Sequence, residues 1–178
     1  MRTLVSNLCL SLLLLSTQVN GQTNTPRDID IDGQTYSLIS ATELLDSLRR
    51  APSTAQLEYR DIAVDGPLFS PTAALDTVRA RLTFANVVFL KEVSFNGIVF
   101  NAETRFEKVQ FNGGLSALGA RFNGDLTLSQ STSRKHTSFK KAVFAGAADF
   151  SNNQFKQTTS FIEAHFAATS FANTHFAA

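Results

Sequence analysis

The chain has no tryptophan, two tyrosines, one methionine and one cysteine among its 178 residues. The single cysteine, Cys9, excludes an intrachain disulfide, so the fold has to be stable without one. Phenylalanine, in contrast, occurs 16 times. A packed core usually mixes aliphatic and aromatic side chains, so this frequency indicates a repeated environment that one side chain fits.

An excess of charge of one sign is also missing. The 16 basic residues nearly match the 15 acidic ones. Residues 22–81 carry six basic and nine acidic groups, and residues 82–178 carry nine basic and six acidic groups. Neither imbalance is large enough to predict a nucleic-acid or membrane partner.

The first residues are typical of a secretory signal peptide over 1–21. Arg2 supplies the positive start, Leu8–Leu15 is the core of a short apolar run, and Val19 and Gly21 suit a cleavage site. The run is shorter than the roughly 20 residues that span a bilayer, although an uncleaved anchor is the alternative. We therefore expect export to the periplasm, the cell envelope or the medium, with no membrane span after cleavage.

Residues 22–80 are predicted to form a small α/β cap that opens with a hairpin. Apolar residues alternate on both sides of Asp32-Gly33, a pair that favours a tight β-turn. Asp28, Asp30 and Asp32 also match the opening of a calcium-binding loop, but its twelfth position is Ile39 and not the required glutamate. The hairpin is the preferred interpretation, and bound calcium the alternative.

A helix is predicted over residues 41–50 of the cap. Ser40 and Glu43 form a capping box, and leucines at 44, 45 and 48 share one face. Pro52 ends the helix. One or two short strands follow between Leu57 and Val64.

A different pattern begins at Phe84. Successive phenylalanines are five and six residues apart in alternation, which gives an eleven-residue period that neither a helix nor a hairpin produces. Such spacing predicts a short strand and a corner, repeated, with Asn-Gly pairs as turn formers. The phenylalanines of this series stand at 84, 89, 95, 100, 106, 111, 122, 139, 144, 150, 155, 161, 166, 171 and 176.

Stretches such as FNGIVFNAETRF, FKKAVFAGAADF and FSNNQFKQTTSF resemble the Phe-centred branch of the pentapeptide-repeat proteins. The residues from ISATELLDSLRR to YRDIAVDGPLF resemble the segment that precedes such repeats. The resemblance implies an all-β fold, a right-handed quadrilateral β-helix with a small N-terminal α/β cap. Four sides then make one coil, which takes two of the eleven-residue periods, and residues 81–178 form about four and a half coils.

This coil length predicts which residues stack. The final two steps are both five residues long, so Phe171 and Phe176 return to the first two columns. Ala117 and Ser133 stand where phenylalanine is expected, which marks the weakest part of the coil. The four predicted columns are Phe84, Phe106, Leu128 and Phe150; Phe89, Phe111, Ser133 and Phe155; Phe95, Ala117, Phe139 and Phe161; and Phe100, Phe122, Phe144 and Phe166.

Two surfaces are candidate binding sites. Basic residues cluster around one coil and could bind an anionic polymer, although a solvated corner is the alternative. The uncovered last coil predicts an end-to-end dimer through Phe171 and Phe176. The members of the possible anion patch are Arg134, Lys135, Lys140, Lys141 and Lys156.

No catalytic set is legible in the sequence, and we expect neither a cofactor nor a bound metal. The three histidines, His136, His165 and His175, are predicted to be solvated, because the last two precede a phenylalanine and lie on opposite sides of the coil. We therefore predict an exported, non-catalytic scaffold or protein-interaction module. The resemblance also implies an alternative, a DNA mimic that binds DNA gyrase as some members of the family do, but the net charge of the repeats, +3, opposes it.

Overall fold

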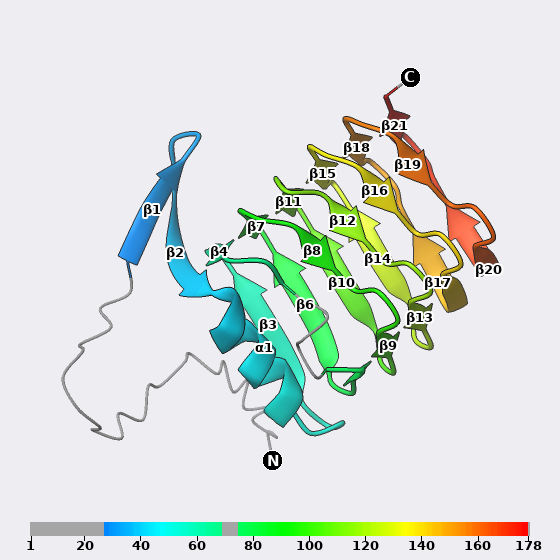
Figure 1. Ribbon diagram of the computed structural model, residues 1–178, viewed down its shortest axis with the longest axis horizontal. Coiled ribbons are helices and arrows are strands. Elements are labelled where there is room, and N and C mark those ends of the chain that lie inside the picture. Colours follow the sequence, from blue (N-terminus) through cyan, green and yellow to red (C-terminus); the bar gives the residue numbers. More distant parts are fainter. Residues whose placement is uncertain (1–26, 69–74, 178) are drawn as a thin grey trace, which may run out of the picture.

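The computed structural model describes residues 27–68 and 75–177. Short parallel strands wind about six times around one axis, with a helix and a hairpin at the N-terminal end (Figure 1). The predicted signal peptide lies outside the described residues.

Each turn of the coil has four sides, which we number in chain order. Strands on one side pair in parallel with the strands of the turns before and after. Side 1 consists of β3 (Gln56–Arg60), β6 (Arg81–Ala85), β10 (Thr104–Glu107), β14 (Leu126–Ser129) and the second halves of β17 (Val143–Asp149) and β20 (His165–Ser170). Side 2 consists of β4 (Ile62–Asp65), β7 (Val88–Phe89), β11 (Gln110–Phe111), β15 (Thr132–Ser133), β18 (Gln154–Phe155) and β21 (His175–Phe176).

The other two sides use shorter strands. Side 3 consists of β8 (Val93–Ser94), β12 (Leu115–Ser116), β16 (Thr137–Ser138) and β19 (Thr159–Ser160). Side 4 consists of β5 (Thr77–Val78), β9 (Val99–Phe100), β13 (Arg121–Phe122) and the first halves of β17 and β20. Two residues per strand are enough because the next corner follows at once.

The predicted columns are confirmed. Phe106 pairs with Phe84 above it and Leu128 below it, and the other sides keep the same offset between turns. In the last turn Phe144 still pairs with Phe166, but Ala148 pairs with Thr169, so the turn shortens there. The two final five-residue steps in the sequence predicted this shortening.

Stacked rings fill the interior of the coil. On side 4 the ring centroids of Phe100, Phe122, Phe144 and Phe166 are 4.8, 5.2 and 4.7 Å apart, with planes within 6° of parallel. These distances match the spacing of neighbouring strands, about 4.8 Å, so each ring packs on the ring one coil away.

The predicted boundary between cap and coil, at residue 81, is wrong. Tyr59 of β3 pairs with Phe84, and Val64 of β4 pairs with Phe89, so an additional turn begins at Gln56. The additional turn, from Tyr59 to Phe84, contains more residues than the next turn, from Phe84 to Phe106. Tyr59 and Val64 stand in its columns in place of phenylalanine. The spacing of the phenylalanines therefore does not reveal this turn, and the predicted four and a half coils are too few.

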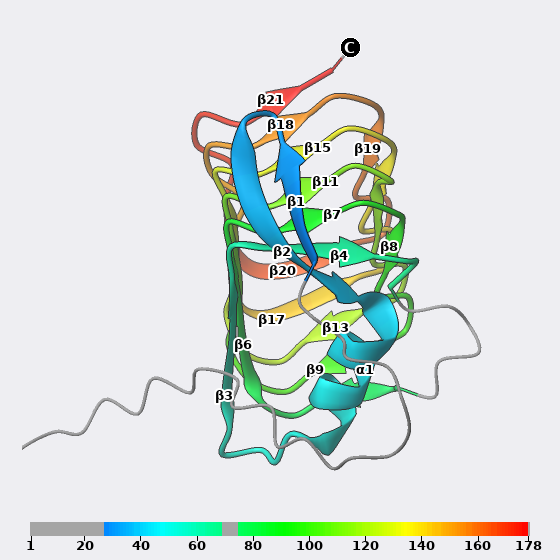
Figure 2. The same cartoon turned by 90° about the vertical axis from the view of Figure 1, so that its left-hand side faces the viewer.

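The hairpin and the helix of the cap are present where they were predicted. Strand β1 (Arg27–Ile31) pairs antiparallel with β2 (Gln34–Ser40), which continues side 2 beyond β4. Helix α1 (Ala41–Arg50) begins with the predicted capping box of Ser40 and Glu43. Helix α1 lies across the first end of the coil (Figure 2), and its Leu44 and Leu48 are buried in the core.

The interior also contains a polar ladder at the corner between sides 1 and 2. The Oγ of Ser131 accepts the backbone N–H of Val109 at 2.9 Å, and the Oδ1 of Asn153 accepts that of Ser131 at 2.9 Å. The Nδ2 of Asn153 donates to the carbonyl groups of Leu128 and Phe150, at 2.6 and 2.8 Å. Asn153 is 1% exposed, so the ladder connects three successive turns inside the core, at Val109, Ser131 and Asn153.

Ser133, predicted to weaken the core, is buried and hydrogen-bonded. Its Oγ accepts a bond of 2.8 Å from the hydroxyl of Thr137 and donates one of 3.1 Å to the carbonyl of Lys135. A buried hydroxyl without a partner is costly, so the serine and the threonine depend on each other.

The corners hold left-handed backbone at fixed positions. Between sides 1 and 2 the chain has positive φ once per turn, at Asp61, Asn86, Lys108, Gln130, Asn152 and Asn173. Gly97, at the corner between sides 3 and 4, also has a positive φ, but Gly113, at the corner between sides 2 and 3, does not. A Cβ at Gly113 would lie 2.2 Å from the backbone nitrogen of Glu92, so close approach of two coils explains this glycine, and turn formation does not.

We expect Asn153→Ala to destabilise the fold by about 2–4 kcal/mol, because it removes the amide that bonds the buried N–H of Ser131 and the carbonyl of Leu128; the carbonyl of Phe150 keeps the hydroxyl of Thr174. Thermal or urea unfolding followed by circular dichroism measures the loss. Gln154→Ala, on the exposed neighbour, is the control and should change stability by less than about 0.5 kcal/mol. Equal effects of the two substitutions would contradict the role of the ladder.

We expect Gln130→Asn to stabilise the protein by about 0.5–1 kcal/mol, because asparagine tolerates positive φ better than glutamine does. Asparagine already occupies the same corner in other turns, at Asn86 and Asn152. Urea unfolding measures the gain, and Gln110→Asn, in a strand, should not reproduce it.

Candidate functional site

The structure divides the predicted anion patch between two corners. Arg134 and Lys156 stack on each other in adjacent turns at the corner between sides 2 and 3, where Lys135 also lies. Lys140 and Lys141 lie at the other end of side 3. Lys141 forms an ion pair of 3.6 Å with Glu163. The five residues therefore do not surround one point.

Arg134 is held by the hairpin. Its guanidinium donates to the carboxylate of Asp32 at 3.2 Å and to the side-chain carbonyl of Gln110 at 3.3 Å. The sequence did not predict this contact, which joins residues 102 positions apart. Both charged side chains are about half exposed or more, so the pair contributes little to stability.

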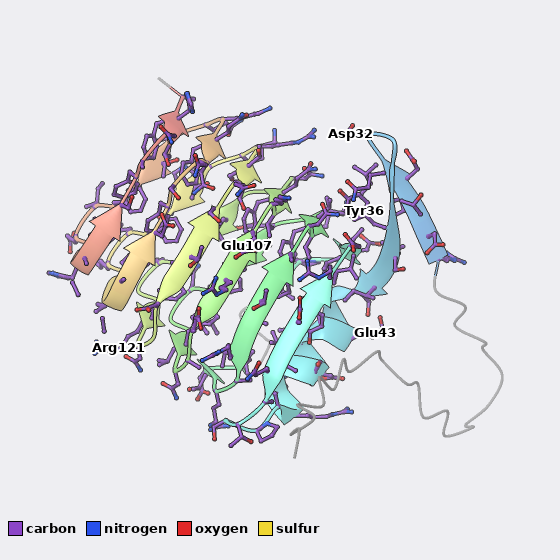
Figure 3. All side chains as sticks on the ribbon, turned by 180° about the vertical axis from the view of Figure 1, so that it is seen from behind. Asp32, Tyr36, Glu43, Glu107 and Arg121 are labelled. Carbon is purple, nitrogen blue, oxygen red and sulfur yellow. The ribbon has the colours of Figure 1, made fainter. Side chains whose placement is uncertain are left out.

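Tyr36 is the main contact between the hairpin and the coil. It is 2% exposed and packs on Ala63 and Val88, the outward residues of the first turns of side 2. Figure 3 shows Tyr36 on the hairpin beside the coil. Burial, and then the negative charges of Asp61 and Asp32, raise the pKa of the Tyr36 hydroxyl.

The three aspartates that resemble a calcium loop bind different partners. Asp28 accepts from Ser37, Asp30 accepts from the backbone N–H of Gly33, and Asp32 pairs with Arg134. Within 27–68 and 75–177 there is no group of three His, Cys, Asp or Glu side chains that could hold a metal ion. The calcium alternative therefore has no support from this geometry.

Side 1 carries ion pairs that sequence reasoning missed. Glu103 contacts Arg81 at 3.3 Å and Arg105 at 2.5 Å, and Arg105 also contacts Glu107 at 3.4 Å. Glu103, Arg105 and Glu107 are two residues apart along one side, and Arg81 lies one turn before Glu103. The predicted length of one coil is therefore sufficient to find these ion pairs from the sequence. They neutralise this face instead of forming a site.

The distal end of the coil is the part where apolar side chains are least covered. Phe176 is 49% exposed, and Phe161, Phe166 and Phe171 are half-buried, although the same columns are fully buried one turn earlier. Strands β19, β20 and β21 have a paired neighbour on one edge only within the described residues. All three histidines are exposed, and His165 and His175 lie on this last turn.

Two hollows on the surface of the described residues are open. One of about 350 Å³ lies beside Phe155, Lys156 and Phe176, and one of about 330 Å³ lies on side 1 over Ala147 and Ala168. Neither reaches the interior, which the stacked rings fill. The described chain also contains no helix that is long and apolar enough to cross a membrane.

Residues 84–132 match the family model of pentapeptide repeats (9 copies). These residues are pentapeptide repeats. The matched residues end just before Ser133, but the pentapeptide-repeat coil continues through the same columns to Phe176. No curated protein and no solved structure matched the chain.

We expect alkaline pH to detach the hairpin through Tyr36. Because its folded-state pKa is raised, the neutral hydroxyl stabilises the fold fully below pH 10, and this stability is lost as the pH rises through the raised pKa. Protection of residues 28–38 from proteolysis measures the effect. Tyr36→Phe should keep the hairpin in place at that pH, and a loss of protection that is the same in the variant would contradict the prediction.

Proposed function

We propose that this pentapeptide-repeat protein is an exported, non-catalytic interaction module whose distal end binds a second copy of the chain. Export is supported by the leader-like sequence of residues 1–21. A non-catalytic role is supported by the filled interior, the open hollows and the ion pairs that neutralise side 1.

The observation that carries this proposal is the composition of the last turn. Four half-exposed or exposed phenylalanines and three strand edges face away from the coil at this end. Soluble proteins usually cover such surfaces, because unpaired strand edges and contiguous apolar side chains promote association.

A second copy is a suitable occupant of this surface. Residues 164–177 contain no Asp, Glu, Lys or Arg, so two copies of the end face meet without repulsion between like charges. A two-fold axis perpendicular to the coil places β20 antiparallel to β20 of the other copy. Antiparallel strands satisfy each other's backbone groups, so one uncharged face completes both ends.

Sedimentation of the full-length chain at micromolar concentration tests the proposal. We expect a dimer, and Phe176→Lys should weaken it about tenfold or more, because a charge at the centre of an apolar contact is costly. Leu118→Lys introduces the same charge at a 42% exposed apolar position just after side 3 and should leave the dimer unchanged.

A monomer at these concentrations, or a dimer that Leu118→Lys weakens as much as Phe176→Lys does, would contradict the proposed contact. A dimer that neither substitution affects would place the interface elsewhere and would also overturn it.

A further inference from the structure

The corner between sides 2 and 3 carries four basic residues in a line parallel to the coil axis. We call Lys91, Arg134, Lys135 and Lys156 the cationic edge. Backbone bonds from Arg134 to Phe111 and from Lys156 to Ser133 place equivalent positions one above another in successive turns. Since neighbouring turns are about 4.8 Å apart, the cations extend over roughly 15 Å.

The middle of the cationic edge has two residues without side chains. Gly113 and Gly114 occupy the turn between Lys91 and Lys135, and a Cβ at Gly114 would lie 3.1 Å from the Cβ of Lys135. Gly114 is therefore buried under the stem of Lys135, and neither glycine places a side chain between Lys91 and Lys135.

The lysines of the cationic edge are available for a ligand. Lys91, Lys135 and Lys156 are exposed, and none of them forms an ion pair with any described residue. Arg134 is tied to Asp32, which positions it in the line. Glu92 beside Lys91 and Asp32 on Arg134 are acidic neighbours of these four, so four positive and two negative charges leave a net charge of +2. The local field is thus positive on a chain whose total charge is close to zero.

A row of serine hydroxyl groups lies beside the cationic edge on side 3. Ser94, Ser116, Ser138 and Ser160 pair one with the next through all four strands. The Oγ atoms of Ser138 and Ser160 accept weak bonds from Lys140 N and Ile162 N, at 3.4 and 3.5 Å, but donate none to the described residues. Their hydroxyl hydrogens can therefore bond to a ligand on this face.

We propose that the cationic edge binds a linear anionic polysaccharide that lies parallel to the coil axis. The lysines contact its sulfate, phosphate or carboxylate groups, and the serines contact its hydroxyl groups. A single-stranded nucleic acid fits less well, because binding of its successive bases usually requires several exposed aromatic side chains, and Phe176 beside Lys156 is a single one. Lys91, Arg134 and Lys135 lie away from the last turn, but Lys156 shares a hollow with Phe176, so the site adjoins the proposed contact between two copies. Sedimentation of the lysine variants therefore accompanies the binding test, so that a loss of heparin affinity and a loss of the dimer can be told apart.

Heparin, a sulfated polysaccharide, is the probe for the test. Its affinity for the full-length chain is measured by calorimetry at several salt concentrations, with neutral dextran as the control ligand. Lys135→Gln with Lys156→Gln should weaken heparin binding about tenfold or more and lower the slope of log affinity against log salt by about two. Lys135→Arg with Lys156→Arg should retain the affinity.

Arg79→Gln with Lys108→Gln is the matched control. Both residues are exposed, neither forms an ion pair with the described residues, and both lie away from this corner. This pair of substitutions should change heparin affinity by less than about twofold, since screening limits the effect of distant charges. An equal loss in the control variant would overturn the site, as would an unchanged salt slope after removal of the two lysines. Binding of single-stranded DNA as tight as that of heparin would overturn the assignment to a polysaccharide.

Discussion

The structure depends on one constraint, the parallel stacking of turns at the distance between neighbouring strands. A side chain that points inward has the equivalent side chain of the next turn beneath it, so each column has to be filled by residues that pack on one another. Flat rings satisfy this requirement because they stack at the same distance as the strands. The positions of the corners follow from this constraint as well, because each turn has to bend from one side to the next at the same place as the turn above it.

The sequence predicted the repeated part of the fold because the constraint is visible in the positions of phenylalanine. The columns, the shortened last turn and the capping box of α1 could all be read in this way. The first turn could not, because Tyr59 and Val64 fill its columns and it is longer than the turns that follow. The role of Gly113 was also missed, since its neighbour in the structure is Glu92, which only the coil brings close.

Prediction of the candidate sites was less complete, for a physical reason. Residues that are close in the sequence can lie at different corners, as Lys135 and Lys140 do, and residues far apart can share a corner, as Lys91 and Lys156 do. A patch defined by sequence proximity is therefore divided by the fold. The contact between Asp32 and Arg134 has no sequence signal, because the direction in which the hairpin folds depends on the burial of Tyr36.

The polar ladder of Ser131 and Asn153 has a consequence for folding. The phenylalanine pattern repeats every eleven residues, which is half a turn, so a chain that slips by eleven residues still places ring on ring. The stacked aromatic residues alone do not distinguish the native alignment from the slipped one. Asn153 does, because after such a slip it lies beneath Ala142, which has no hydroxyl group to take the place of Ser131. A single buried amide thus gives an almost periodic chain a unique alignment of its turns.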